Sequence, residues 1–220
     1  MDWVVLLPVK TAAVSKSRLA TAFDDPADLA ALVQAMRLDT VAALRDTPGV
    51  VGLIAVVDRF DAARGLGAGI DVVVQQSAGL NPALTEADAF ALHRWPGLGR
   101  VAVVGDLPAL TPGAMREVLA GAAGAARSFV PDLAGTGTTM LAATSGPLAP
   151  RFGPGSAARH ATDAVALPAA AEARHDVDVP EDLTPPVAAG FGPATRAALA
   201  AVHGAHRTDR DVTATVCPGP

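Results

Sequence analysis

The sequence predicts an α/β protein in which helices cover both faces of a mostly parallel sheet. Four short apolar runs have the length of strands, and they are continuously rather than alternately hydrophobic, which is typical of strands buried on both faces. These runs span residues 4–9, 52–57, 72–74 and 100–104. Segments with helical spacing of apolar residues separate them. The chain has 220 residues, of which 50% are hydrophobic, so it can bury one large core.

The predicted helices begin at recognisable capping residues. Asp24-Asp25-Pro26 combines an acidic cap with a proline near the first helical position. Apolar residues then recur at roughly helical spacing, at Leu29, Leu32, Met36, Val41 and Leu44. Further helices are expected from residue 62, over residues 81–95 and from a Thr111 cap to residue 120, and further strands over residues 128–130 and 139–142.

We expect a single domain over residues 1–204, followed by a tail over residues 205–220. The tail has no apolar periodicity, and its only sizeable apolar side chains are Val212, Val216 and Cys217. Ordering each backbone residue costs about 1–2 kcal/mol, which three modest side chains do not offset. The tail is therefore predicted to be disordered and to contribute little to stability.

Composition argues against several classes of function. The net charge is −5, from 17 basic and 22 acidic residues, and aromatic residues make up 4%, so no nucleic-acid surface is expected. The single cysteine, Cys217, excludes a disulfide framework within the chain. No run of about 18 uncharged apolar residues occurs, and no basic segment precedes an apolar stretch at the start. We expect a cytoplasmic protein that binds neither nucleic acid nor membrane.

Polar residues and glycines follow the predicted strands at the points where the strands end. Ligands of a doubly wound sheet bind beyond the carboxyl ends of its strands, so these residues are expected to gather at one edge. In chain order they are Lys10, Lys16 and Arg18, then Gly79 and Asn81, Asp106, Gly135 to Thr138, Arg151 to Ser156, and Asp176 with Asp178. Cations, glycine-rich turns, hydroxyls and acids together suit a phosphate-rich ligand bridged by a metal ion.

Two common nucleotide-binding fingerprints are missing. The pattern G-x-x-x-x-G-K-[ST] does not occur, which excludes a P-loop enzyme. Gly65, Gly67 and Gly69 have the wrong spacing for a dinucleotide-binding turn, and they precede a strand instead of following one.

The acids are the candidate metal ligands. Asp106 ends a buried apolar strand and is expected to bind Mg²⁺, which takes carboxylate oxygens together with substrate phosphates. A cap on the following turn is the alternative role. Asp176 and Asp178 are two residues apart, which places both carboxylates on one face of an extended segment. They either complete the metal site or form an ordinary surface motif before Pro180.

The cations are the candidate partners of a triphosphate. Lys10 directly follows the first strand and is the best placed, with Lys16 and Arg18 close behind. All three are expected to act in catalysis by neutralising phosphate charge, although such residues also occur in solvated loops. Asn81 either caps a helix or contacts the nucleotide.

The later glycine-rich segments are candidate anion sites. Gly135 and Gly137 allow close backbone approach to an anion, and they equally suit a plain hairpin. Gly153 and Ser156 stand at the predicted start of a helix, where free N–H groups favour a phosphate or carboxylate, with ordinary capping as the alternative. His160 is expected to be a structural hydrogen-bonding residue and not a base, because a phosphate acceptor is already anionic.

In their order along the chain, these motifs resemble the CofC/FbiD family of guanylyltransferases, which serve the deazaflavin coenzyme F-420. The resemblance runs from about Val4 to Ala200. It is carried by Pro8-Val9-Lys10, Lys16-Ser17-Arg18-Leu19, Gly79-Leu80-Asn81, Val104-Gly105-Asp106-Leu107-Pro108, Gly135-Thr136-Gly137-Thr138, Arg151-Phe152-Gly153-Pro154-Gly155-Ser156 and Asp176-Val177-Asp178. It implies a Rossmann-like nucleotidyltransferase (GT-A-like) sandwich, in agreement with the strand pattern.

The resemblance also implies a reaction and assigns residues to it. GMP from GTP would be joined to the phosphate of phosphoenolpyruvate, with release of diphosphate and with Mg²⁺ as cofactor. Thr138, Gly153 and Ser156 would bind this acceptor. The nucleotide would contact Lys10, Gly79, Asn81 and Asp106, and the metal would bind Asp106, Asp176 and Asp178. The next enzyme of coenzyme F-420 biosynthesis is the candidate partner, by hand-over of the product.

Three alternatives stay open. The acceptor can be 2-phospho-L-lactate, the chain can be another nucleotidyltransferase of this fold, or it can bind GTP without catalysis. The three acids at 106, 176 and 178 argue against a non-catalytic protein. The alanine-rich composition suggests a GC-rich bacterial source, and the bacterial branch of the family is associated with phosphoenolpyruvate, which favours that acceptor.

Overall fold

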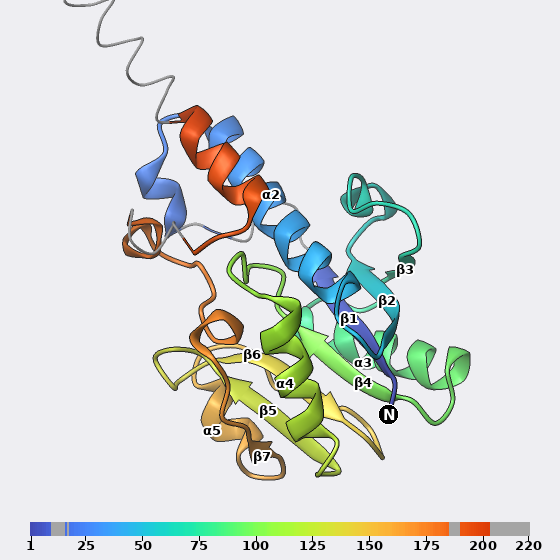
Figure 1. Ribbon diagram of the computed structural model, residues 1–220. Coiled ribbons are helices and arrows are strands. Elements are labelled where there is room, and N and C mark those ends of the chain that lie inside the picture. The colour runs from blue at the N-terminus through green and yellow to red at the C-terminus, as the bar shows by residue number, and fades with distance from the viewer. Residues whose placement is uncertain (10–15, 17, 185–189, 203–220) are drawn as a thin grey trace, which may run out of the picture.

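A seven-stranded sheet forms the centre of the protein, with helices on both of its faces (Figure 1). The computed structural model describes residues 1–9, 16, 18–184 and 190–202, so the predicted tail and the boundary at residue 204 lie outside the described residues. The strands are β1 (Trp3–Val9), β2 (Val50–Val57), β3 (Asp71–Val74), β4 (Gly99–Val103), β5 (Arg127–Pro131), β6 (Thr138–Ala143) and β7 (Val165–Ala166). Their order is β3-β2-β1-β4-β6-β5-β7.

The sheet is mostly parallel, which confirms the predicted fold class. β1 runs parallel to β2 and β4, and β2 runs parallel to β3. β6 is reversed between β4 and β5, because residues 132–137 turn the chain back in a hairpin. The Asp132 carboxylate accepts hydrogen bonds from the N–H groups of Thr136 and Gly137, at 2.9 and 2.8 Å, and closes this turn.

The predicted helix caps are confirmed. Asp25 accepts a 2.8 Å hydrogen bond from the N–H of Ala27, and Thr111 accepts a 3.1 Å bond from the N–H of Ala114. The helices are α2 (Pro26–Arg45), α3 (Leu80–Arg94), α4 (Pro112–Ala122) and α5 (Ser156–His160), and residues 193–202 are also helical. Shorter turns of 3₁₀-helix are η1 (Leu19–Ala22), η2 (Phe60–Ala63), η3 (Ala171–Ala173) and η4 (Pro180–Leu183).

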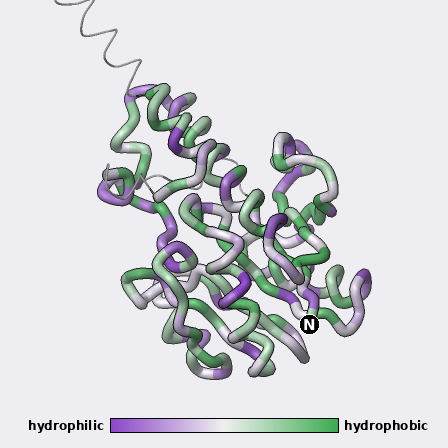
Figure 2. The backbone as a smooth tube through the Cα atoms, viewed as in Figure 1, coloured by the Kyte–Doolittle hydropathy of each residue, from purple (hydrophilic) through white to green (hydrophobic). Residues whose placement is uncertain are grey.

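Both faces of the sheet are buried, as continuous apolar strands require. Val5 and Leu7 of β1 point to the face covered by α2 and α4, whereas Val4 and Leu6 point to the face covered by α3. Hydrophobic residues accordingly run along the central strands in Figure 2. Within the described part of the chain, no helix is both long and apolar enough to cross a membrane.

The last described helix is attached to α2 by a buried carboxylate. Asp39 of α2 accepts hydrogen bonds from the N–H groups of Ala194 and Thr195, at 3.1 and 2.7 Å, and so caps the helix over residues 193–202. The two helices lie side by side in Figure 1. This contact fixes the half of α2 that also carries Arg37, a residue of the cleft described below.

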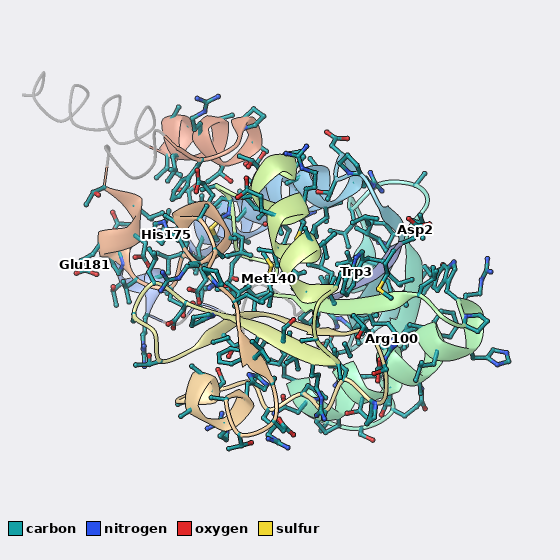
Figure 3. All side chains as sticks on the ribbon, turned by 60° about the horizontal axis from the view of Figure 1, so that its bottom comes forward. Asp2, Trp3, Arg100, Met140, His175 and Glu181 are labelled. Carbon is teal, nitrogen blue, oxygen red and sulfur yellow. The ribbon has the colours of Figure 1, made fainter. Side chains whose placement is uncertain are left out.

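A buried ion pair joins α3 to the start of β4. Arg100 and Asp88 are almost fully buried, and the Arg100 Nε donates a 2.8 Å hydrogen bond to Asp88 Oδ1. Asp88 Oδ2 also accepts from the N–H of Leu148, at 2.9 Å. Arg100 follows Gly99, the residue that pairs with Trp3 of β1, and Figure 3 labels both Trp3 and Arg100 in this region.

We predict that Asp88→Ala lowers the free energy of unfolding by about 3–5 kcal/mol, because the guanidinium of Arg100 would stay buried without its partner. Urea unfolding followed by circular dichroism measures the change. The matched control is Asp61→Ala, which breaks the exposed ion pair with Arg59 and should cost less than about 1 kcal/mol. Equal losses in the two variants would contradict the prediction.

Candidate active site

A cleft lies where β1 and β4 end, at the predicted ligand edge of the sheet. Strand ends, helix α2, the start of α3 and the segment before η4 all contribute to it. The lining residues are Pro8, Lys16, Val33, Arg37, Leu80, Val104, Gly105, Asp106 and Asp178. The structure therefore brings together three of the predicted site residues, Lys16, Asp106 and Asp178, from widely separated parts of the sequence.

Lys16 is the central cation of this cleft. Its ammonium group donates hydrogen bonds to Oδ2 of Asp106 and Oδ1 of Asp178, and its side chain is only 5% exposed. Burial alone would lower the pKa of Lys16, but the charges and hydrogen bonds of the two carboxylates outweigh it and raise the pKa above its ordinary value. Lys16 therefore carries a full positive charge between two acids.

The predicted acidic cluster forms because residues 176–178 lie against the end of β4. The buried Val177 donates its backbone N–H to the Asp106 carbonyl, at 3.1 Å, which holds Asp176 and Asp178 near the Asp106 carboxylate. Burial, followed by the negative charges of Asp106 and Asp178, raises the pKa of Asp176 to about 7. The cleft thus concentrates negative charge that favours additional cations.

The carboxylates of the cleft provide part of what a divalent metal ion needs. Within the described ranges, no three His, Cys, Asp or Glu side chains are arranged to hold a metal by themselves. Asp106 Oδ1 is nevertheless buried without a hydrogen-bond partner. The other carboxylate oxygen, Oδ2, and Oδ1 of Asp178 both accept hydrogen bonds from Lys16. Mg²⁺ usually binds one or two carboxylates and completes its shell with waters and substrate phosphates. Asp106 and Asp178 fit that pattern, whereas a cage of all three predicted acids does not.

Arg37 is a cleft residue that the sequence analysis missed. It lies on α2, is 8% exposed and lines the cleft together with Asp106 and Asp178. Burial lowers the pKa of Arg37, and the nearby Asp106 carboxylate opposes that shift. A signal was present in the sequence, because Arg37 follows Leu29 and Val33 at steps of four and so falls on the apolar face of the helix.

The other predicted cations are placed differently. Lys10 lies outside the described residues. Arg18 is exposed, stands before the first turn of η1 and is not among the lining residues of the cleft. Lys16 is therefore the one of the three that the described structure positions in the cleft.

Helix α3 begins at Leu80, one residue earlier than predicted. Gly79 directly precedes it, and Asn81 is its second residue. Gly79 has a φ of 108° and precedes the helix, a conformation that favours glycine. Asn81 is not the cap. Its side-chain amide donates to the Phe152 carbonyl at 3.1 Å, and its carbonyl accepts from the Phe152 N–H at 2.7 Å. Asn81 thus ties the nucleotide side of the predicted site to the segment over residues 151–156.

The three predicted acceptor residues come together, although none of them is among the lining residues of the cleft. Ser156 Oγ lies 3.1 Å from Thr138 Oγ1, and the Gly153 carbonyl accepts the Ser156 N–H at 3.0 Å. Thr138 opens β6, whose next residue, Thr139, accepts the N–H of Val104 at the end of β4. The hydroxyls of Thr138 and Ser156 therefore lie near the edge that carries Asp106.

The helix at this predicted anion site has only five residues. The helix expected to follow Gly153 and Ser156 is α5, which spans only Ser156–His160. One turn of helix aligns few peptide dipoles, so its N-terminus contributes little positive charge. An anion bound at this position would therefore depend on side-chain hydroxyls more than on a helix dipole.

His160 closes the hydrogen-bond network of this region. Its Nδ1 lies 2.9 Å from Thr138 Oγ1, and its Nε2 accepts the N–H of Arg151 at 2.9 Å. The residue is 1% exposed. Burial, followed by the positive charges of Arg151 and Arg159, lowers the pKa of His160 to about 4. The imidazole is therefore neutral at physiological pH.

We predict that His160 makes the protein less stable as the pH falls from 6.5 towards 4. Over this interval the unfolded chain binds a proton at His160 that the native state does not bind, so stability present above pH 6.5 is lost. Urea unfolding across this range should show a loss, on the order of 2 kcal/mol, that His160→Asn lacks. Parallel pH profiles for the two proteins would refute this role of His160.

Comparison with known proteins identifies close relatives in sequence. "Phosphoenolpyruvate guanylyltransferase" of Thermomonospora curvata is 44% identical over 207 residues, which cover 91% of this chain and 90% of that protein. The protein of the same name from Streptomyces coelicolor is 42% identical over 207 residues, which cover 91% of this chain and 97% of that protein.

Solved structures share the fold at low sequence identity. A protein described as a nucleotide-diphospho-sugar transferase, from Desulfovibrio desulfuricans G20, superposes with a TM-score of 0.69 at 16% identity, covering 94% of this chain and 98% of that one. A 4-diphosphocytidyl-2C-methyl-D-erythritol synthase superposes with a TM-score of 0.56 at 13% identity, covering 82% and 95%. These matches confirm the Rossmann-like nucleotidyltransferase fold.

The family assignment follows from the match over nearly the whole described domain. The family model "Guanylyl transferase CofC like" matches residues 3–185, a range that contains every predicted site residue. Such a nucleotidyltransferase family suggests a requirement for a divalent metal ion. This chain belongs to the CofC-like guanylyl transferase family.

Proposed function

We propose that the chain transfers GMP from GTP to the phosphate of phosphoenolpyruvate, in the biosynthesis of coenzyme F-420. The products are enolpyruvyl-diphospho-guanosine and diphosphate. The observation that carries the proposal is the cleft in which Lys16 and Arg37 face Asp106 and Asp178, at the carboxyl ends of parallel strands of a guanylyl transferase. Relatives named for phosphoenolpyruvate, at 37–44% identity, support this acceptor over 2-phospho-L-lactate.

The chemistry is an in-line displacement at phosphorus. An oxygen of the acceptor phosphate forms a bond to the α-phosphorus of GTP, and the bond from that phosphorus to the diphosphate oxygen breaks. The attacking oxygen is already anionic, so no side chain needs to remove a proton. Because both reactants are polyanions, the barrier is dominated by their repulsion and by their positioning.

Cations of the cleft lower this repulsion. Lys16 is held in place by two carboxylates and presents a fixed positive charge at the strand ends. Arg37 adds a second buried cation to the lining of the cleft. Lys10 and Arg18 remain the predicted additional partners of the triphosphate, and Gly79 with Asn81 the predicted partners of the nucleoside.

Mg²⁺ is the proposed metal cofactor. Asp106 and Asp178 would hold it, with Asp176 beside them as the third predicted acid. Bound there, the ion would neutralise charge on the phosphate oxygens as the transition state forms. We place the reaction in the cytoplasm, and the product, a reactive enol ester, would pass to the next enzyme of the pathway.

Release of diphosphate is the direct test. The purified protein is incubated with GTP, Mg²⁺ and either phosphoenolpyruvate or 2-phospho-L-lactate, with the next biosynthetic enzyme present to consume an unstable product. Diphosphate that appears only with phosphoenolpyruvate supports the proposal. Release with 2-phospho-L-lactate alone would change the acceptor, and no release with either, despite GTP binding, would favour a non-catalytic protein. CTP or ATP in place of GTP tests the choice of base.

We predict that Asp106→Ala lowers turnover at saturating Mg²⁺ by at least about a hundredfold, the scale of removing a strong electrostatic partner of the transition state. Diphosphate release measures turnover, and circular dichroism confirms folding. Asp58→Ala is the matched control, since Asp58 also directly follows a strand but is exposed and does not line the cleft. Near-normal turnover of a folded Asp106→Ala protein would remove Asp106 from the mechanism.

A further inference from the structure

His160 occupies a single tautomer in this structure. The backbone N–H of Arg151 donates to Nε2, so this nitrogen uses its lone pair and carries no hydrogen. A neutral imidazole has one N–H, which must then be on Nδ1. Nδ1 lies 2.9 Å from Thr138 Oγ1, so His160 donates to the threonine hydroxyl and does not accept from it.

This direction determines how the two neighbouring hydroxyls use their hydrogens. Thr138 and Ser156 have one hydroxyl hydrogen each, and their oxygens lie 3.1 Å apart. One of the hydrogens joins the two hydroxyls, and the other is left over because Nδ1 does not accept it. With the opposite tautomer, Ser156 would donate to Thr138 and Thr138 to Nδ1, and both hydrogens would be used.

We propose that His160 is a positioning residue that makes the Thr138–Ser156 hydroxyl pair a net donor to an anionic oxygen of the acceptor. The inference rests on the proposed function and deepens it. Thr138 stands at the start of β6, beside the end of β4, and Thr138 and Ser156 are both buried. A buried hydroxyl hydrogen without an acceptor costs free energy, which binding of a carboxylate or phosphate oxygen recovers.

The surroundings of His160 keep the imidazole in the required form. Arg151 and Arg159 are the nearby cations and Asp163 is the nearby acid. The rings of Phe129 and Phe152 pack at centroid distances of 5.9 and 5.2 Å. Protonation would place a hydrogen on Nε2, directly against the N–H of Arg151, and would break the contact that selects the tautomer.

Two amide variants separate the contacts of His160. Asparagine places its NH₂ group near the position of Nδ1, so His160→Asn keeps a donor to Thr138 and loses the acceptor for Arg151. Glutamine places its terminal carbonyl near Nε2, so His160→Gln keeps the acceptor for Arg151 and loses the donor to Thr138. Each variant thus serves as the matched control of the other.

We expect His160→Gln to raise the KM for phosphoenolpyruvate by about tenfold, the equivalent of one hydrogen bond to a charged group, because Thr138 Oγ1 loses the donor that fixes the direction of its own hydrogen. His160→Asn should raise it by less than about threefold. The KM for GTP should stay unchanged in both, and melting temperatures report any general loss of structure. An equal rise of the phosphoenolpyruvate KM in the two variants, or no rise in either, would overturn the inference.

A spectroscopic measurement on the wild-type protein does not depend on variants that fold. Nitrogen-15 chemical shifts of the imidazole nitrogens distinguish the tautomers, and His160 is one of five histidines in the chain. The Nδ1–H form supports the inference, and the Nε2–H form overturns it. Failure of the proposed function shows separately, as wild-type protein that releases no diphosphate with phosphoenolpyruvate. If it acts on 2-phospho-L-lactate instead, the same variants are compared on that acceptor.

Discussion

The cleft depends on the ammonium group of Lys16, which donates hydrogen bonds to both Asp106 and Asp178. Asp106, Asp176 and Asp178 come from segments about 70 residues apart, and three carboxylates in a half-buried site repel one another. Lys16 offsets this repulsion by binding two of them at once. Burial, together with the charges of Asp106 and Asp178, still raises the pKa of Asp176, so the balance is incomplete. Under the proposed function, the remaining negative charge would suit a divalent cation that arrives with a polyphosphate.

A backbone contact also brings the acids to this place. The hydrogen bond from Val177 to the Asp106 carbonyl docks residues 176–178 on the end of β4, and the buried Val177 side chain secures it. Asp39 anchors the last described helix to α2, two residues from Arg37. The positions of Asp178 and Arg37 therefore depend on Val177 and Asp39, two residues that do not line the cleft.

The sequence was sufficient for features that depend on local patterns. Continuous apolar runs predicted the buried strands, and the capping residues Asp25 and Thr111 predicted where two helices begin. Asp106 was predicted as a site residue because it is an acid at the end of an apolar strand. It was insufficient where a residue's partner lies far along the chain. The Asn81 amide is satisfied by Phe152, 71 residues away, so a capping pattern was misleading, and Arg37 showed only as a charge on an apolar helix face.

The two halves of the site use different kinds of donor, and the proposed reaction gives a reason. Under the proposed function, the nucleotide side would present charged groups, Lys16 and Arg37, whereas the acceptor side would present neutral hydroxyls supported by a neutral His160. The guanidinium of Arg151 is occupied by Asp163. Under the proposed reaction, a leaving diphosphate gains charge and benefits from fixed cations. The attacking phosphate must keep its electron density, so neutral donors can orient the acceptor without reducing its nucleophilicity.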